Sequence, residues 1–264
     1  MFIIILASAL IFIIVILGIG YLNFNTSVKK EINALLTSKI ISENRNAFRN
    51  LESIPLLLQN YIKKVNVTEK PSYYNITLKQ KGKIRSYPKQ KWLTFNAKQY
   101  MSVDQLAFIW KAKSFPMLVR DKFMDGQGEM KINLLGIKNI EVATGPKIDQ
   151  GSLTRYLGEL PIYANALLDN RITWEVIDNN SLKATIHVKN VIADGIFYFD
   201  ENGLISSFKT KRYMLGSLND FTGTFQNYKN IDGLLIPTEL TAIWNLDDED
   251  YPYFKCKVVH YELK

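Results

Sequence analysis

The chain has 264 residues, of which 47% are hydrophobic and 12% aromatic, and its formal net charge is +8. A single cysteine, Cys256, excludes an intrachain disulfide and a metal site built from several cysteines. The lysines are spread along the chain, which argues against nucleic-acid binding and favours a domain held near anionic lipid headgroups.

An apolar segment lies at the N-terminus. From Phe2 to Leu22 the only interruptions are Ser8 and two glycines. A helix of this length spans about 30 Å, the thickness of one hydrocarbon core. No Lys or Arg precedes the segment, and the small-residue pattern around Ser8 lies too early for a cleaved signal peptide. The sequence therefore predicts an uncleaved single-pass anchor over residues 1–23. Lys29 and Lys30 follow the span, so the positive-inside rule favours the cytoplasmic side for the domain.

A helical connector is predicted over residues 24–70. Apolar residues recur at helical spacing from Val28 to Ile41. Ser53 near a cap and Pro55 in the first turn then indicate a second, short helix over residues 56–64.

Residues 71–264 are predicted to form one β-rich domain. Short segments of alternating polarity are separated by turns every 8 to 15 residues, which is typical of an antiparallel meander. Gly82 is expected in a turn, and Asp125-Gly126-Gln127-Gly128 is a hairpin signal. One helix, interrupted near Pro161, is expected over residues 149–168. The expected strands are 73–79, 83–86, 92–100, 106–114, 119–124, 129–135, 137–143, 172–177, 182–188, 195–199, 204–215, 220–229, 234–246 and 253–263.

The sequence contains none of the strong catalytic motifs: no HExxH, paired CxxC, P-loop or GxSxG. His187 and His260 lie in strand patterns without catalytic or metal-ligand spacing, and Cys256 alternates with Phe254 and Val258 as a buried thiol would. No catalytic residue, metal ligand or cofactor is therefore assigned. Lone acids such as Asp121, Asp178 and Glu239 are interpreted as turn or edge residues.

The candidate ligand residues lie on the central helix and on aromatic strands. Arg155 and Glu159 share a helix face, with Tyr156 beside them. They form either a solvent-exposed ion pair or one wall of a groove in which Arg155 and Arg212 bind an anionic headgroup or carboxylate. The tryptophans fill the core or line an apolar cavity. The candidate set is Arg155, Tyr156, Glu159, Arg212, Trp110 and Trp174.

The order of several motifs resembles that of a bacterial, membrane-anchored family of unknown function, over roughly residues 50–264. Asn60 departs from that resemblance, since the family tends to carry Arg there. The matching residues include Ile54-Pro55, Gly82-Lys83-Ile84-Arg85, Trp92-Leu93-Thr94-Phe95-Asn96-Ala97, Asp121-Lys122-Phe123, Gly126-Gln127-Gly128-Glu129, Gly151-Ser152-Leu153-Thr154-Arg155-Tyr156-Leu157-Gly158-Glu159-Leu160, Phe199-Asp200-Glu201-Asn202-Gly203 and Gly233-Leu234-Leu235-Ile236-Pro237.

More loosely, the predicted fold resembles the lipoprotein-carrier (LolA-like) half-barrel. That resemblance implies an α+β, mostly β fold: a curved antiparallel sheet with a helix packed on its concave face, here preceded by a transmembrane helix. It also implies an extracytoplasmic domain that binds lipid acyl chains.

Three hypotheses follow for the function. The first is a membrane-tethered, non-enzymatic domain that binds a lipid or other apolar ligand in a groove between sheet and helix. The second is an interaction subunit of a cell-envelope complex, which predicts a large exposed apolar patch. The third is an envelope hydrolase, which needs a His or carboxylate with a perturbed pKa in a cleft.

Overall fold

In the computed structural model, which describes residues 1–37, 49–67 and 75–263, thirteen strands form one antiparallel sheet. The first six strands are β1 (Asn75–Ile84), β2 (Leu93–Ser102), β3 (Ala107–Ser114), β4 (Met117–Met124), β5 (Gln127–Leu134) and β6 (Lys138–Ala143). The other seven are β7 (Ile172–Asp178), β8 (Ser181–Val188), β9 (Val191–Phe199), β10 (Ile205–Met214), β11 (Ser217–Ile231), β12 (Leu234–Asn245) and β13 (Asp250–Leu263).

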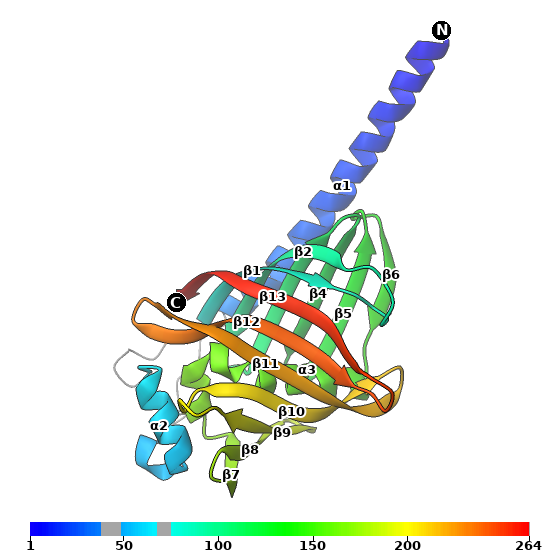
Figure 1. Cartoon of the computed structure of the whole chain (residues 1–264). Coiled ribbons are helices and arrows are strands. Elements are labelled where there is room, and N and C mark those ends of the chain that lie inside the picture. Colours follow the sequence, from blue (N-terminus) through cyan, green and yellow to red (C-terminus); the bar gives the residue numbers. More distant parts are fainter. Residues whose placement is uncertain (38–48, 68–74, 264) are drawn as a thin grey trace.

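Two meanders make up this sheet. The spatial order is β6-β5-β4-β3-β2-β1-β13-β12-β11-β10-β9-β8-β7, so the meanders meet where β13 pairs with β1. The chain passes from edge strand β6 to edge strand β7 through α3 (Pro146–Gly158) and two 3-10 turns, η2 (Leu160–Ile162) and η3 (Ala164–Leu168). This segment lies within the curve of the sheet, where its apolar side chains join the core (Figure 1). The predicted half-barrel with a helix on its concave face is confirmed.

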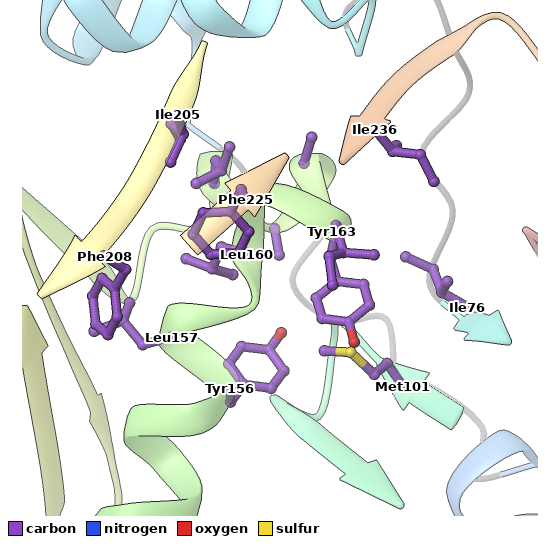
Figure 2. Close-up of a cluster of buried hydrophobic side chains, with 14 of the residues drawn as sticks. Ile76, Met101, Tyr156, Leu157, Leu160, Tyr163, Ile205, Phe208, Phe225 and Ile236 are labelled. Carbon is purple, nitrogen blue, oxygen red and sulfur yellow. The ribbon is translucent and has the colours of Figure 1, made fainter. Parts of the chain in front are cut away.

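The crossing segment packs a dense core against the sheet. Leu157 and Leu160 lie beside Phe208 and Phe225, and all four side chains are buried (Figure 2). Burying an apolar side chain of this size contributes about 1.5–3 kcal/mol. Pro161 lacks an amide hydrogen, and the α-helix ends just before it, so the predicted interruption is confirmed. The helix begins at Pro146, three residues earlier than predicted.

The convex face carries the N-terminal helix α1 (Phe2–Thr37). Side chains of β3 alternate between the faces: Trp110 joins the concave core, whereas Ile109 packs with Val28, Ile32 and Leu35 of α1. The sequence predicts two helices here, but the structure has one. No proline or glycine separates residues 22 and 28, so nothing breaks the helix. Residues 38–41 of the second predicted helix lie outside the described residues.

The first part of α1 extends away from the sheet (Figure 1). It is long and apolar enough to cross a membrane, and none of its most apolar stretch is buried within the protein. Helix α2 (Leu56–Lys64) instead packs against the domain, with Leu58, Tyr61 and Ile62 buried. It follows the short 3-10 turn η1 (Leu51–Ser53) and matches its predicted bounds, with Pro55 as the residue just ahead of the first turn.

Gly82 is the clearest error in the strand assignment. It lies inside a continuous β1, whereas the sequence predicts a turn there; residues 73 and 74 of the predicted strand lie outside the described residues. A Cβ at Gly82 would lie 2.2 Å from the carbonyl oxygen of Lys255 and 2.7 Å from the Phe95 ring. The position therefore requires glycine because the neighbouring strand and ring approach closely, which is a packing requirement that mimics a turn signal.

The predicted hairpin after β4 is confirmed, with a shorter turn. Only Asp125 and Gly126 connect β4 and β5, and both have positive φ, at 55° and 79°. Two successive residues with positive φ form the turn type that suits the twist of adjacent strands.

Candidate functional site

A cavity of about 330 Å³ lies between the concave face of the sheet and one side of α3. Strands β1 to β5 and β10 to β13 form its walls. Its apolar lining is Ile84, Leu93, Phe95, Trp110, Ala112, Met117, Val119, Met130, Ile132, Phe208, Phe221, Phe225, Leu240, Ala242, Tyr253 and Phe254. Its polar lining includes Arg85, Ser86, Ser114, Asp121, Thr154, Arg155, Glu159, Arg212, Thr224 and Thr241.

Stacked aromatic rings make one wall of this cavity. The Phe95 ring packs edge-on against Trp110 at 5.5 Å between centroids and stacks on Phe254 at 5.2 Å. The indole nitrogen of Trp110 donates a hydrogen bond of 2.9 Å to Gln80 Oε1. Trp110 is thus held in place with its polar atom satisfied, and the Arg155 guanidinium lies 5.3 Å from its ring centroid, so this ring lines the cavity beside the polar cluster.

Arg155 forms the polar centre of the helix side. Its Nε lies 2.9 Å from Glu159 Oε1, and its Nη1 lies 2.6 Å from Asp121 Oδ2. Its Nη2 donates a hydrogen bond of 3.0 Å to Gln99 Oε1, and Tyr163 donates one of 3.1 Å to Glu159. These contacts connect α3 to β2 and β4, so the cluster fixes the helix to the sheet.

Burial and charge act against each other in this cluster. Burial raises the pKa of Asp121 above its ordinary value, although Arg155 and Arg212 lower it. Burial lowers the pKa of Arg155, but Glu159 and Asp121 outweigh that effect and raise it above its ordinary value. Arg155 therefore stays protonated and pairs with two carboxylates, and Arg212 adds a second positive charge near Asp121.

Arg212 differs from Arg155 in its surroundings, which are aromatic rings and a backbone carbonyl group. Its guanidinium lies 4.7 Å from the Phe221 ring and 5.8 Å from the Trp244 ring, and its Nη2 donates to the carbonyl oxygen of Gly151 at 3.2 Å. Within the described chain it has no carboxylate partner at ion-pair distance, and its Nε is buried without a hydrogen bond. A planar guanidinium in this position is suited to carboxylate or phosphate oxygens.

The structure brings together four of the six predicted ligand residues. Arg155, Glu159, Arg212 and Trp110 all line the cavity. The other two lie elsewhere. Tyr156 is completely buried on another side of α3, and Trp174 packs on Phe197 at 5.7 Å, so neither contributes to the cavity lining.

The histidines, the cysteine and the other two acids singled out from the sequence lie outside this site. His187 and His260 are exposed strand residues. Cys256 is buried, as predicted, and burial raises the pKa of its thiol well above the ordinary value. Asp178 accepts hydrogen bonds from its own turn, and Glu239 pairs with Lys257 on the surface. Across residues 1–37, 49–67 and 75–263, no group of His, Cys, Asp or Glu is placed to hold a metal ion.

Two residues of the polar cluster around Arg155 were missed from the sequence. Asp121 is predicted as a turn or edge residue, but it lies within β4 and pairs with Arg155. Gln99 is completely buried on β2 and joins the same cluster. The available signal was alternation: Gln99 falls in step with Phe95 and Ala97, and Asp121 with Val119 and Phe123, so both occupy inward-facing positions.

Solved structures with a similar fold share 12% sequence identity with this chain. A domain from Vibrio parahaemolyticus described as a putative outer membrane lipoprotein-sorting protein domain matches 81% of this chain and 94% of its own at a TM-score of 0.47. A LolA superfamily protein from Nitrosomonas europaea matches 78% and 93% at 0.45. A DUF1329 family protein from Desulfovibrio piger matches 77% and 91% at 0.46.

Sequence comparison gives the family. No curated protein matches the chain. One family model matches residues 44–256, and it is described as a family of unknown function, DUF6544. That range covers well over half of the sequence and most of the region in which the resemblance to a family of unknown function was predicted. The chain therefore belongs to the DUF6544 family.

Proposed function

We propose that this protein is a membrane-anchored, non-enzymatic binding domain that holds the apolar part of a lipid-like ligand between its sheet and α3. The observation that carries the proposal is the cavity of about 330 Å³, because most of its lining is aliphatic or aromatic. Sites for small ligands have volumes of about 300–1,000 Å³ and are lined in this way, with a few polar groups that fix orientation.

Arg212 suggests the polar end of the ligand. Asp121 and Glu159 both pair directly with Arg155, whereas Arg212, although close enough to lower the pKa of Asp121, has no carboxylate at ion-pair distance among the described residues. A carboxylate or phosphate on the ligand would supply that partner and also accept a hydrogen bond from the buried Nε. The favoured ligand is therefore an amphiphile with one acidic group and an apolar chain.

The ion pairing of the Asp121 and Glu159 carboxylates favours a binding function over catalysis. A hydrolase would need a carboxyl group free to move a proton at the reacting bond. Asp121 and Glu159 are both ion-paired to Arg155, and Glu159 also accepts a hydrogen bond from Tyr163. Asp121 has the raised pKa that the hydrolase hypothesis requires, but Arg155 engages both carboxylates, and these contacts favour a structural role for the pair.

Native mass spectrometry tests this proposal. A version lacking residues 1–22 keeps Val28, Ile32 and Leu35, the α1 residues that pack on the sheet. We expect a discrete added mass that organic solvent extracts and that lipid analysis identifies as an acidic amphiphile. A clean apo mass, together with no uptake of long-chain fatty acids or phospholipids added from vesicles, would contradict the proposal.

A second candidate function is an interaction subunit of a cell-envelope complex. The observation that favours it is a set of exposed apolar side chains at neighbouring turns, among them Phe115 and Ile137. Stoichiometric recovery of one envelope protein with the full chain, lost when these two residues are replaced by Asp, would support this alternative.

A further inference from the structure

Exposed apolar side chains gather at two turns that are joined to each other. Phe115, in the β3–β4 turn, is 80% exposed, and Ile137, in the β5–β6 turn, is 54% exposed. The amide of Leu135 donates a hydrogen bond of 3.0 Å to the carbonyl oxygen of Pro116, so the two turns form one unit. We call this unit, residues 115–116 and 134–137, the apolar tip.

The apolar tip is fixed to α1 at the end of its apolar segment. The backbones of Gly20 and Gly136 touch: a Cβ on Gly20 would lie 2.9 Å from the carbonyl carbon of Gly136. Gly20 lies two residues before Leu22, the last residue of the apolar segment, which is about 3 Å along the helix axis. If α1 spans a bilayer, this contact places the apolar tip at the boundary between hydrocarbon and headgroups.

Charged and aromatic side chains at this level suit a membrane surface. Tyr21 follows Gly20 directly, and Lys113 lies 5.4 Å from its ring. Lys113 and Lys138 are exposed on either side of the apolar tip. Tyrosine is enriched at membrane interfaces, and lysines near the surface are attracted to anionic lipids.

The same tip forms part of the cavity rim. Ser114 and Met117, which flank the β3–β4 turn on either side, both line the cavity. Ile84 and Leu93, at the ends of β1 and β2, line it at the same edge of the sheet. The apolar tip therefore borders the cavity at the end of the sheet that contacts α1.

We infer that the apolar tip inserts into the bilayer that α1 crosses, and that the ligand enters the cavity past Phe115 directly from that bilayer. Only the entry route for the ligand rests on the proposed function. Contact between tip and bilayer needs no ligand, so the two parts can fail separately.

Lipid quenching tests the contact in the full chain. Phe115→Cys or Ile137→Cys is labelled with a polarity-sensitive fluorophore in nanodiscs of phosphatidylcholine and phosphatidylglycerol. Cys256 is buried, and burial raises the pKa of its thiol, so the introduced cysteine takes the label. The control is Val176→Cys, an equally apolar residue that is 67% exposed on β7, far from the free part of α1 (Figure 1).

We expect phospholipids with a nitroxide on the acyl chain to quench labels at 115 and 137 and to leave the label at 176 unchanged. Quenching at 115 and 137 no greater than at 176 would overturn the inference. Labels shielded from aqueous quenchers but untouched by the nitroxide lipid would indicate a protein on the tip, which would also overturn it.

Photocrosslinking tests the entry route. Full-length protein is placed in nanodiscs that contain phosphatidylglycerol with a diazirine on its acyl chain, and crosslinked residues are mapped by mass spectrometry. We expect crosslinks at cavity residues such as Met130, their loss in the F115D/I137D double variant, and no change in V176D. Crosslinks that persist in the double variant would overturn the entry route. No cavity crosslinks in the wild-type protein, with quenching at 115 and 137 intact, would overturn the proposed function and leave the membrane contact standing.

Discussion

The two ends of the concave face are built from the same sheet and the same crossing segment, yet one is filled and the other is hollow. At the filled end, Leu157, Leu160 and Tyr163 are completely buried against the strands. At the hollow end, the same segment presents Thr154, Gly158 and the ion-paired residues described above. The difference lies in which side chains the helix presents, since the strands supply large apolar residues to both ends. A cavity at this position is therefore a property of the helix sequence.

The largest expected effect is at the filled end. Leu160→Ala should lower the free energy of unfolding by about 2–5 kcal/mol, because it removes buried contacts and leaves a void. Leu240→Ala, the matched change at the hollow end, should cost less, since its side chain already borders the cavity. Urea unfolding of versions lacking residues 1–22 measures both. Equal losses would show that the two ends are packed alike.

Filling the hollow end should remove binding without unfolding the protein. Ala242 is half-buried on β12 and lines the cavity, so Ala242→Phe would place a ring where the apolar chain is proposed to lie. We expect loss of the copurified ligand in native mass spectra, with little change in the unfolding midpoint. The control is Ile243→Phe, the next residue along the strand. Full ligand retention in A242F would place the ligand elsewhere.

Arg212→Ala should weaken binding of an acidic amphiphile by about 1.5–3 kcal/mol, or roughly 10- to 150-fold, the range for hydrogen bonds to charged groups. The probes are hexadecanoate and hexadecanol, which share an apolar chain and differ in charge. Fluorescence displacement should show the loss for the acid and little change for the alcohol. Lys211→Ala is the control, because Lys211 is exposed and paired with Asp220. Equal losses for both probes would assign Arg212 a structural role.

Most of the strands could be predicted from the sequence because each has its own alternating pattern and its own turn residues. The turn before β5 is one example, since Asp125-Gly126 specifies its backbone locally. Gly82 could not be read correctly, because its requirement for glycine comes from Lys255 and Phe95, which are distant in sequence. Sequence patterns report on the conformation of neighbouring residues, whereas the need for glycine at position 82 arises from residues on other strands.

The same dependence on distant residues explains why only part of the candidate site could be predicted from the sequence. Arg155 and Glu159 are four residues apart on one helix, so their pairing was visible in the sequence. The third member, Asp121, lies 34 residues away on β4. Tyr156 adjoins Arg155 in sequence, but a rotation of about 100° per residue turns it toward the filled end. The spacing in the sequence therefore predicted the pair of Arg155 and Glu159. Strand pairing brings Asp121 to this pair, and the rotation of the helix takes Tyr156 away from it.

The smallest expected effect concerns Asp121. Burial raises its pKa in the folded protein, assisted by Glu159 and opposed by Arg155 and Arg212. A carboxyl group with a raised folded pKa contributes stability below its unfolded pKa of about 4, and that contribution is lost as the pH rises through the folded pKa. Asp121→Asn removes this titration. We therefore expect the free energy of unfolding of the wild type, relative to D121N, to fall as the pH rises above about 4.

Urea titrations across a pH series measure that difference, and D125N, at an 80% exposed turn residue, gives the background. A difference that stays constant with pH would mean that burial and ion pairing cancel, and one that grows with pH would mean that the pairing with Arg155 outweighs burial, so that the hollow end carries a net stabilising ion pair.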